Sequence, residues 1–240
     1  MRKLLLPLSY TVCLIAFILW LPAMALVRLV TAPFDPGRLA VGRLFRLWAV
    51  LVVRVCTVWR ARVEGTLPPG ACVVVANHES FGDVLLLSVL PREMKWMAKE
   101  SLFKLPWVGW MLRLAGDISV RRGDREAGAR ALQEARVWLQ RGVPVMVFPE
   151  GTRSRTSELL PFKPGAFQLA IELGLPVVPV ALAGTLEGMP QGGIWVRAAR
   201  PRARVLAALT TQGLRAEDAP ALAAEARERI AAARAQLQAQ

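Results

Sequence analysis

The hydrophobic pattern divides the chain into an apolar N-terminal part and a longer part in which short apolar runs alternate with helical patterns. Residues 4–27 contain no charged side chain. A helix of this length would be about 36 Å long, enough to cross a hydrocarbon core of about 30 Å. Pro22 would kink or end that helix, so a shorter segment that enters one leaflet and returns is a second interpretation. A third is a signal peptide, because Arg2 and Lys3 precede the apolar run and residues 23–25 have the A-x-A form of a cleavage site.

A second apolar segment, residues 39–59, carries its positive charges on one side. On a helical wheel Arg43, Arg46 and Arg54 lie close together, and apolar residues occupy the remaining positions. This pattern is typical of a helix that lies in the headgroup region, with its arginines on lipid phosphates. A membrane span with snorkelling arginines is the alternative. Residues 32–37 between the two segments predict a turn, so the pair would form a membrane-embedded helical hairpin.

From residue 61 onward the pattern predicts an α/β domain. Apolar, β-branched runs indicate strands at residues 73–76, 96–98, 118–120, 143–148, 177–183 and 203–209. Apolar positions at helical spacing indicate helices at residues 84–90, 125–141, 165–173 and 221–238, the second of them with Asp124 as its N-cap. Alternating strands and helices predict one domain with a mixed, largely parallel sheet flanked by helices.

The same pattern gives a division of the chain. Residues 1–60 form the expected membrane-anchoring segment, residues 61–215 the α/β domain and residues 216–240 a C-terminal helix. Glycine and proline in residues 184–201 predict a long loop near the end of the domain.

Charge and cysteine content narrow the possible partners. The net charge is +13 although 54% of the residues are hydrophobic, and this combination favours an anionic membrane surface over nucleic acid. No nucleic-acid-binding motif is present. The three cysteines, Cys13, Cys56 and Cys72, show no metal-binding spacing and argue against a disulfide scaffold. We therefore expect no metal site, no nucleic-acid partner and a reducing compartment.

Candidate chemistry centres on His78, the only histidine in the chain. It follows an apolar run and precedes a helical pattern, with Asp83 five positions later. Residues five apart in one helix do not face each other, so His78 is expected in the turn and Asp83 in the first turn of the helix. The carboxylate would then hold one ring nitrogen and leave the other free to act as a general base. A hydrogen-bonded turn or core histidine is the alternative interpretation.

The sequence offers no obvious nucleophile next to this base. Cys72 lies on the preceding strand, and Ser80 lies outside any nucleophile-elbow pattern. The simplest inference is that the nucleophile belongs to the substrate, an alcohol that His78 deprotonates.

A second stretch, Glu150-Gly151-Thr152-Arg153, follows the apolar run at residues 143–148. A guanidinium that offers paired donors, a glycine that lets the backbone approach a ligand and a hydroxyl together indicate an anion cradle. Taken alone, this stretch is also explained by a solvent-exposed turn that contains an arginine.

Together, the two stretches NHESFGD and FPEGTRS resemble the first and third motifs of the glycerolipid acyltransferases, the family of 1-acyl-sn-glycerol-3-phosphate acyltransferases. The likeness runs from about residue 63 to residue 185. The other segments that carry it are residues 97–102, 116–122, 161–166 and 175–180. One departure stands in the second motif, where Ser119 and Arg121 replace the usual aromatic residue and acid ahead of the arginine.

This resemblance implies a single glycerolipid-acyltransferase-like domain of the α/β class. It implies transfer of a fatty acyl group from acyl-CoA or acyl carrier protein to the sn-2 hydroxyl of 1-acyl-glycerol-3-phosphate, which gives phosphatidate for phospholipid biosynthesis. No cofactor is implied, because the thioester donor supplies the driving force. The expected location is the cell membrane, with the active site on its cytoplasmic face.

The resemblance also assigns roles to residues. His78 would be the general base and Asp83 its orienting acid. Residues expected to bind the acceptor's glycerol-phosphate part are Glu150, Gly151, Thr152, Arg153, Lys99 and Arg122. The altered second motif leaves other acceptors open, such as lyso-ornithine lipid or glycerol-3-phosphate. Two further alternatives are a hydrolase that passes the acyl group to water and a membrane-surface scaffold without activity.

Overall fold

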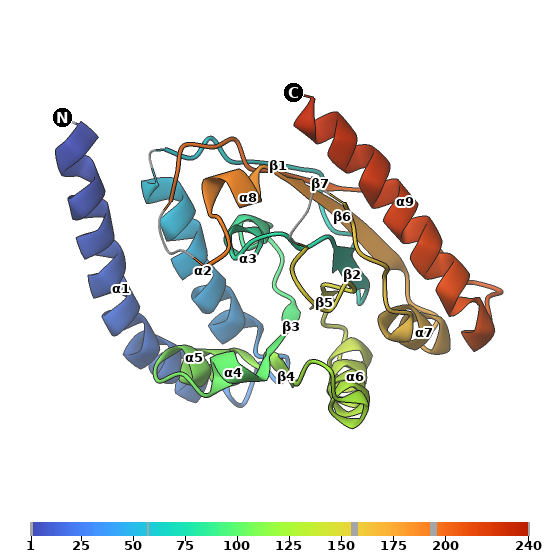
Figure 1. Ribbon diagram of the computed structural model, residues 1–240. Helices are drawn as coiled ribbons and strands as arrows, with labels where there is room; N and C mark the ends of the chain where they lie inside the picture. The colour runs from blue at the N-terminus through green and yellow to red at the C-terminus, as the bar shows by residue number, and fades with distance from the viewer. Residues whose placement is uncertain (1, 57, 155–157, 193–195, 240) are drawn as a thin grey trace.

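A sheet whose strand order is β1-β7-β6-β2-β5-β3-β4 organises the molecule (Figure 1). The computed structural model describes residues 2–56, 58–154, 158–192 and 196–239. Neighbouring strands are parallel except β6 and β7, which are antiparallel. The predicted mixed, largely parallel sheet is confirmed. The strands are β1 (Arg62–Glu64), β2 (Val73–Ala76), β3 (Lys95–Lys99), β4 (Ile118–Val120), β5 (Val145–Val147), β6 (Val177–Ala183) and β7 (Arg202–Val205).

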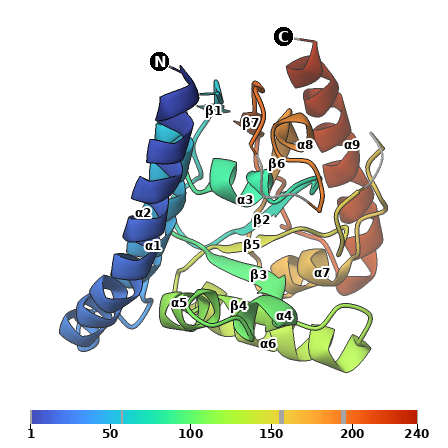
Figure 2. The ribbon, with the colours of Figure 1, turned by 60° about the vertical axis from the view of Figure 1, so that its left-hand side comes forward.

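Helices cover both faces of this sheet (Figures 1 and 2). On one face α6 (Arg125–Gln140), α7 (Gly165–Glu172) and α9 (Ala219–Gln238) form the largest apolar cluster. On the other face lies α3 (Gly82–Leu87), covered by α2 (Leu39–Val55), which in turn packs against α1 (Arg2–Thr31) and α5 (Val108–Ala115). The remaining short helices are α4 (Glu100–Phe103), α8 (Thr185–Gly188) and a 3-10 turn, Ala216–Asp218.

The two-sided covering explains why strand β2 is apolar at every position. Val73 and Val75 pack toward α6, α7 and α9, whereas Val74 and Ala76 pack toward α3. A strand buried on both faces has no polar side, so it reads as a continuous β-branched run. This burial fixes the end of β2, from which the candidate base follows.

Helix α2 packs into the domain, so the prediction that its arginines face lipid phosphates is wrong for two of the three. Arg46 is 5% exposed and donates to Asp117 Oδ1 at 2.5 Å. Arg43 donates to the backbone oxygen of Leu90 at 2.7 Å. A helical wheel cannot reveal these partners because they lie far away in the sequence. Only Arg54 is exposed.

The N-terminal segment forms one continuous helix, α1, which passes through Pro22 instead of ending there. Within the described parts of the chain, no helix has the length and apolar character that a membrane crossing needs. The expected membrane-embedded hairpin is therefore not supported.

Other differences are local. The predicted loop at residues 184–201 contains the short helix α8, and β1, α4 and α5 were not expected from the sequence. Strand β1, α4 and α8 are too short for a periodic pattern to stand out. Helix α6 begins as predicted, with the Asp124 side chain accepting a hydrogen bond from the backbone amide of Ala127 at 2.9 Å.

Candidate active site

The carboxyl ends of five parallel strands meet at one edge of the sheet, where open α/β sheets place their ligands. The residues expected at the site belong to this edge, and one further polar residue joins them there. They are His78 after β2, Lys99 at the end of β3, Arg122 after β4, Glu150 to Arg153 after β5 and Thr185 after β6.

The predicted contact between His78 and Asp83 is present. Nδ1 of His78 lies 2.8 Å from Oδ2 of Asp83, and both side chains are buried. His78 occupies the turn after β2, and Asp83 lies in the first turn of α3. The arrangement leaves Nε2 as the ring nitrogen that can accept a proton from a ligand.

Asp83 is held as a hydrogen-bond acceptor on every side. Its Oδ2 accepts from the backbone amides of Glu79 at 2.7 Å and Ser80 at 2.9 Å, and its Oδ1 accepts from the hydroxyl of Thr185. A carboxylate oxygen can only accept hydrogen bonds, so the ring nitrogen that contacts it, Nδ1, is the one that carries the hydrogen. The carboxylate therefore fixes the ring tautomer as well as its orientation.

No described side chain beside the imidazole is placed to act as an enzyme nucleophile. The Ser80 hydroxyl donates to the backbone oxygen of Met189 at 2.6 Å and accepts from the amide of Gly82. Burial raises the pKa of Cys72 to about 11, which keeps its thiol protonated. These contacts agree with a nucleophile supplied by the substrate.

Two residues near the dyad were missed from the sequence. The ring of Phe148 stacks on the imidazole with 3.9 Å between ring centroids, and Thr185 bonds Asp83 from the far side. Strands β5 and β6 are the two neighbours of β2; Phe148 directly follows β5, and Thr185 lies two residues after β6. Polar or aromatic residues at the ends of neighbouring parallel strands were the signal that could have identified them.

The structure gives Glu150 a position inside the protein. It is 4% exposed, and its two carboxylate oxygens accept from the backbone amides of His78 at 2.8 Å and Leu160 at 3.0 Å. Burial raises the pKa of Glu150, and the hydrogen bond from the His78 amide opposes that shift. Its carboxylate therefore braces the turn that carries His78, an arrangement that differs from the expected contact with an acceptor.

A cavity of about 380 Å³ opens beside the imidazole. Its walls are mainly apolar and come from α1 to α5 and β3, with Phe45, Trp48, Leu85 and Met111 among them. Other lining residues are His78 and three of the predicted cations, Lys99, Arg122 and Arg153. The cavity thus joins a base, a positively charged lining and an apolar interior.

Two cations of this lining, Arg122 and Arg153, are close enough for the charge of one to affect the pKa of the other. Partial burial lowers the pKa of Arg122, and the charge of Arg153 lowers it further. The two guanidiniums repel each other, and an anion bound between them would reduce this repulsion. The unexpected Arg121 of the second motif points elsewhere, since its Nε donates to Glu100 Oε2 at 2.7 Å on the surface.

Gly151 and Thr152 lie in the turn after β5 and are not among the residues that line the cavity. Gly151 has φ +70°, a conformation that favours glycine, and a Cβ there would lie 2.8 Å from Nζ of Lys163. Thr152 is exposed. A second, open pocket of about 450 Å³ is lined by Arg153, Leu186, Gln191 and Gly192, so Arg153 lines both this pocket and the cavity beside His78.

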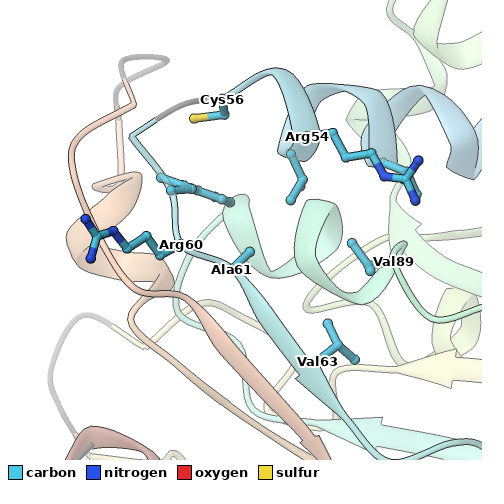
Figure 3. A pocket seen from close by; sticks show the side chains of 9 residues that line it. Arg54, Cys56, Arg60, Ala61, Val63 and Val89 are labelled. Atoms are coloured by element: carbon cyan, nitrogen blue, oxygen red, sulfur yellow. The ribbon is translucent and has the colours of Figure 1, made fainter.

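A third pocket, of about 370 Å³, lies between the end of α2, β1 and α3 (Figure 3). Arg54 and Cys56 on one side and Arg60 on the other flank an apolar floor that includes Val63 and Val89. Burial raises the pKa of Cys56, so its thiol is a poor nucleophile at neutral pH. Among the described residues that line this pocket there is no histidine, aspartate or glutamate. In the described parts of the chain, no group of three or more His, Cys, Asp or Glu side chains could hold a metal ion.

Comparison with known proteins identifies the family to which this fold and site correspond. The sequence profile of the Acyltransferase family matches residues 60–183. The chain belongs to this family.

Relatives within the family carry a consistent name. The chain is 44% identical to a 1-acyl-sn-glycerol-3-phosphate acyltransferase of Chlamydomonas reinhardtii over 130 residues, 54% of this chain and 39% of the relative. It is 36% identical to the chloroplastic enzyme BAT2 of Brassica napus, which bears the same name, over 61% of this chain and 43% of the relative. The chain thus spans less than half the length of these two relatives.

A solved structure agrees along the whole chain. The 1-acyl-sn-glycerophosphate acyltransferase PlsC from Thermotoga maritima superposes with a TM-score of 0.82 at 26% identity, over 100% of this chain and 99% of that one. The similarity therefore includes the N-terminal helices as well as the α/β domain.

Proposed function

We propose that the protein transfers a fatty acyl group from acyl-CoA or acyl carrier protein to the sn-2 hydroxyl of 1-acyl-glycerol-3-phosphate. The observation that carries the proposal is the imidazole of His78, oriented by Asp83, at a mainly apolar cavity whose lining includes Lys99, Arg122 and Arg153. Membership of the Acyltransferase family and the names of the relatives support it.

In the proposed reaction Nε2 of His78 takes the proton of the acceptor hydroxyl while its oxygen attacks the thioester carbonyl. A C–O bond forms, the C–S bond breaks, and the leaving thiolate receives the proton from the imidazolium. Asp83 stabilises the imidazolium between these two transfers, as a carboxylate does in a catalytic triad. The step forms no acyl-enzyme, because the acceptor hydroxyl itself is the nucleophile. The hydroxyl of Ser80 is occupied by its own hydrogen bonds.

The cavity suggests how the two substrates are held. Its apolar walls fit an acyl chain, and Arg153, Arg122 and Lys99 supply charge for a phosphate. Fixing the phosphate and the chain places the hydroxyl near Nε2, and such positioning can contribute several kcal/mol to catalysis. Glu150 contributes by bracing the His78 turn.

A direct test is a product assay by mass spectrometry with purified protein, 1-acyl-glycerol-3-phosphate and each donor. Phosphatidate is the expected product. A panel with lyso-ornithine lipid and glycerol-3-phosphate separates the other acceptors, and free fatty acid without phosphatidate would identify a hydrolase. No product from any acceptor with either donor would contradict the proposal.

Replacing Arg153 by alanine should raise the KM for the acceptor about tenfold, which is the lower end of the loss expected for one hydrogen bond to a charged group, about 1.5–3 kcal/mol. The kcat should change much less, because Arg153 makes no described contact with the dyad. Steady-state kinetics with varied acceptor measures both constants. Arg121→Ala is the matched control, since Arg121 pairs with Glu100 outside the cavity. An unchanged KM in the Arg153 variant would remove this residue from acceptor binding.

The exposed apolar face of α1 supports a proposal about location. Leu19 is 61% exposed, Leu26 62% and Leu29 75%. Exposed leucines in such a row indicate a surface that enters a membrane or binds a partner. Since the proposed acceptor is a membrane lipid, we infer that this face of α1 inserts into the outer part of one leaflet.

The double substitution Leu26→Glu and Leu29→Glu should reduce binding to vesicles that contain anionic phospholipid by at least about tenfold, because burying each leucine contributes about 1.5–3 kcal/mol. Co-sedimentation with the vesicles measures the binding. Val137→Glu on α6, also at an exposed apolar position, is the control. Equal sedimentation of all three proteins would contradict the insertion of α1.

A further inference from the structure

A buried ion pair links the residue next to the catalytic base to the C-terminal helix. Oε1 of Glu79 lies 2.5 Å from Nη2 of Arg234 on α9, and these side chains are 3% and 9% exposed. The same oxygen accepts from Nδ2 of Asn77 at 3.3 Å. Helix α9 packs on the sheet face opposite α3, so the pair reaches the His78 turn from the side away from the cavity (Figure 1).

The backbone of Glu79 is itself part of the candidate site. Its N–H donates to Asp83 Oδ2 at 2.7 Å, beside the contact that this oxygen makes with His78. Its carbonyl oxygen accepts from Nε2 of Gln191 at 2.9 Å, and that amide nitrogen also donates to the carbonyl of Ser154. A displacement of Glu79 would therefore move the carboxylate that orients the imidazole and the loop that carries Arg153.

The charge of the Glu79 side chain depends on its ion pair with Arg234. Burial raises the pKa of Glu79, Arg234 opposes that shift and Asp83 and Glu187 add to it, and the net result is a pKa of about 7. Without Arg234 the carboxyl would face two other acids in a buried position. Its pKa would then rise further, so the carboxyl would be protonated and uncharged at neutral pH.

We propose that Arg234 is a positioning residue for the acyl-transfer site. Through Glu79 it holds the backbone that follows His78 and that hydrogen-bonds Asp83. The kinetic part of this inference rests on the proposed function. The positional part concerns the His78–Asp83 contact alone and does not depend on any reaction.

The test compares Arg234→Met, which keeps most of the length and removes the charge, with Arg229→Met as the matched control. Arg229 is on the same helix, but it is exposed, and in the described parts of the chain its ion pair is with Glu225 on the surface. We expect Arg234→Met to lower kcat roughly tenfold with little change in the KM for either substrate, as displacement of a positioned group does. Arg229→Met should match the unsubstituted protein, and circular dichroism should show both variants folded.

A second measurement requires no substrate. Because His78 is the only histidine, the proton on its Nδ1 gives a single low-field NMR signal in untagged protein labelled with ¹⁵N-histidine. This signal should weaken or shift upfield in Arg234→Met and stay unchanged in Arg229→Met. An unchanged signal with an unchanged kcat would overturn the proposal. If the unsubstituted protein transfers no acyl group at all, the proposed function fails, and the NMR comparison still tests the positioning.

Glu79→Gln completes a double-mutant cycle and changes only one atom of the side chain. In the unsubstituted background it should lower kcat, because Arg234 loses its charged partner. In the Arg234→Met background it should have almost no effect, because the glutamic acid there is already protonated. Additive losses would show that the two residues act separately and would contradict the inference. Arg234→Lys, which keeps the charge, should recover part of the activity and covers the case in which the methionine variant does not fold.

Discussion

Replacing His78 by alanine should lower kcat by roughly a thousandfold to ten-thousandfold, because general-base catalysis contributes up to about that factor. The expectation is at the upper end of the range because the two described carboxylates in contact with the His78 turn cannot take over as the base. The carboxylate of Asp83 is occupied by backbone amides and a hydroxyl, and that of Glu150 by two amides. Product formation in a single turnover, with donor and acceptor saturating, measures the chemical step directly.

The control for this substitution addresses packing. His78 stacks on Phe148, so alanine also leaves a gap in the wall of the cavity. Phe148→Leu disturbs the same stack and keeps the base, and it should cost far less activity. A His78→Ala protein that is folded and as active as the unsubstituted one would end the assignment of His78 as the base.

The second large effect concerns Asp83→Asn, for which we expect a loss in kcat of about a hundredfold, corresponding to one hydrogen bond to a charged group. The amides of Glu79 and Ser80 both donate to the Oδ2 position, so the oxygen of the asparagine should occupy it. Nδ1–H of His78 then keeps its acceptor and the ring keeps its tautomer. The loss comes from the missing negative charge beside the imidazolium.

Two comparisons check this interpretation. Asp83→Ala removes the acceptor altogether and should cost more activity as well as thermal stability, measured by the melting temperature. Thr185→Val removes only the hydroxyl on Oδ1 and should cost only a few-fold. If Asp83→Asn proves as inactive as Asp83→Ala, the amide has turned its nitrogen toward His78, and the proposed role of the two backbone donors is wrong.

The sequence predicts best what depends on neighbours along the chain. Strands β2 and β6 have the predicted bounds, because a run buried on both faces is apolar throughout and ends where the chain turns. The His78–Asp83 contact follows from the spacing of two residues across a strand-to-helix turn. Both predictions rest on local geometry.

Interactions between distant parts of the chain were not accessible in the same way. Glu150 accepts a hydrogen bond from the backbone amide of His78, and Arg46 donates one to Asp117, which is distant in the sequence. A motif indicates that an acid or an arginine is present, but the partner that decides its role is chosen by the packing of the sheet. The same holds for Phe148. In the sequence it is the last apolar residue of a predicted strand, and in the structure its ring stacks on the imidazole of His78.

Helix α2, which carries the buried Arg46, is part of the domain and cannot be treated as a removable anchor. Helix α2 supplies Phe45, Arg46, Trp48 and Ala49 to the lining of the cavity beside His78. A variant shortened to the α/β domain in the hope of better solubility would lack this wall and leave the acyl chain in water. Chimaeras that exchange the first helices between relatives should therefore inherit chain-length preference from the helix donor, together with any change in membrane affinity.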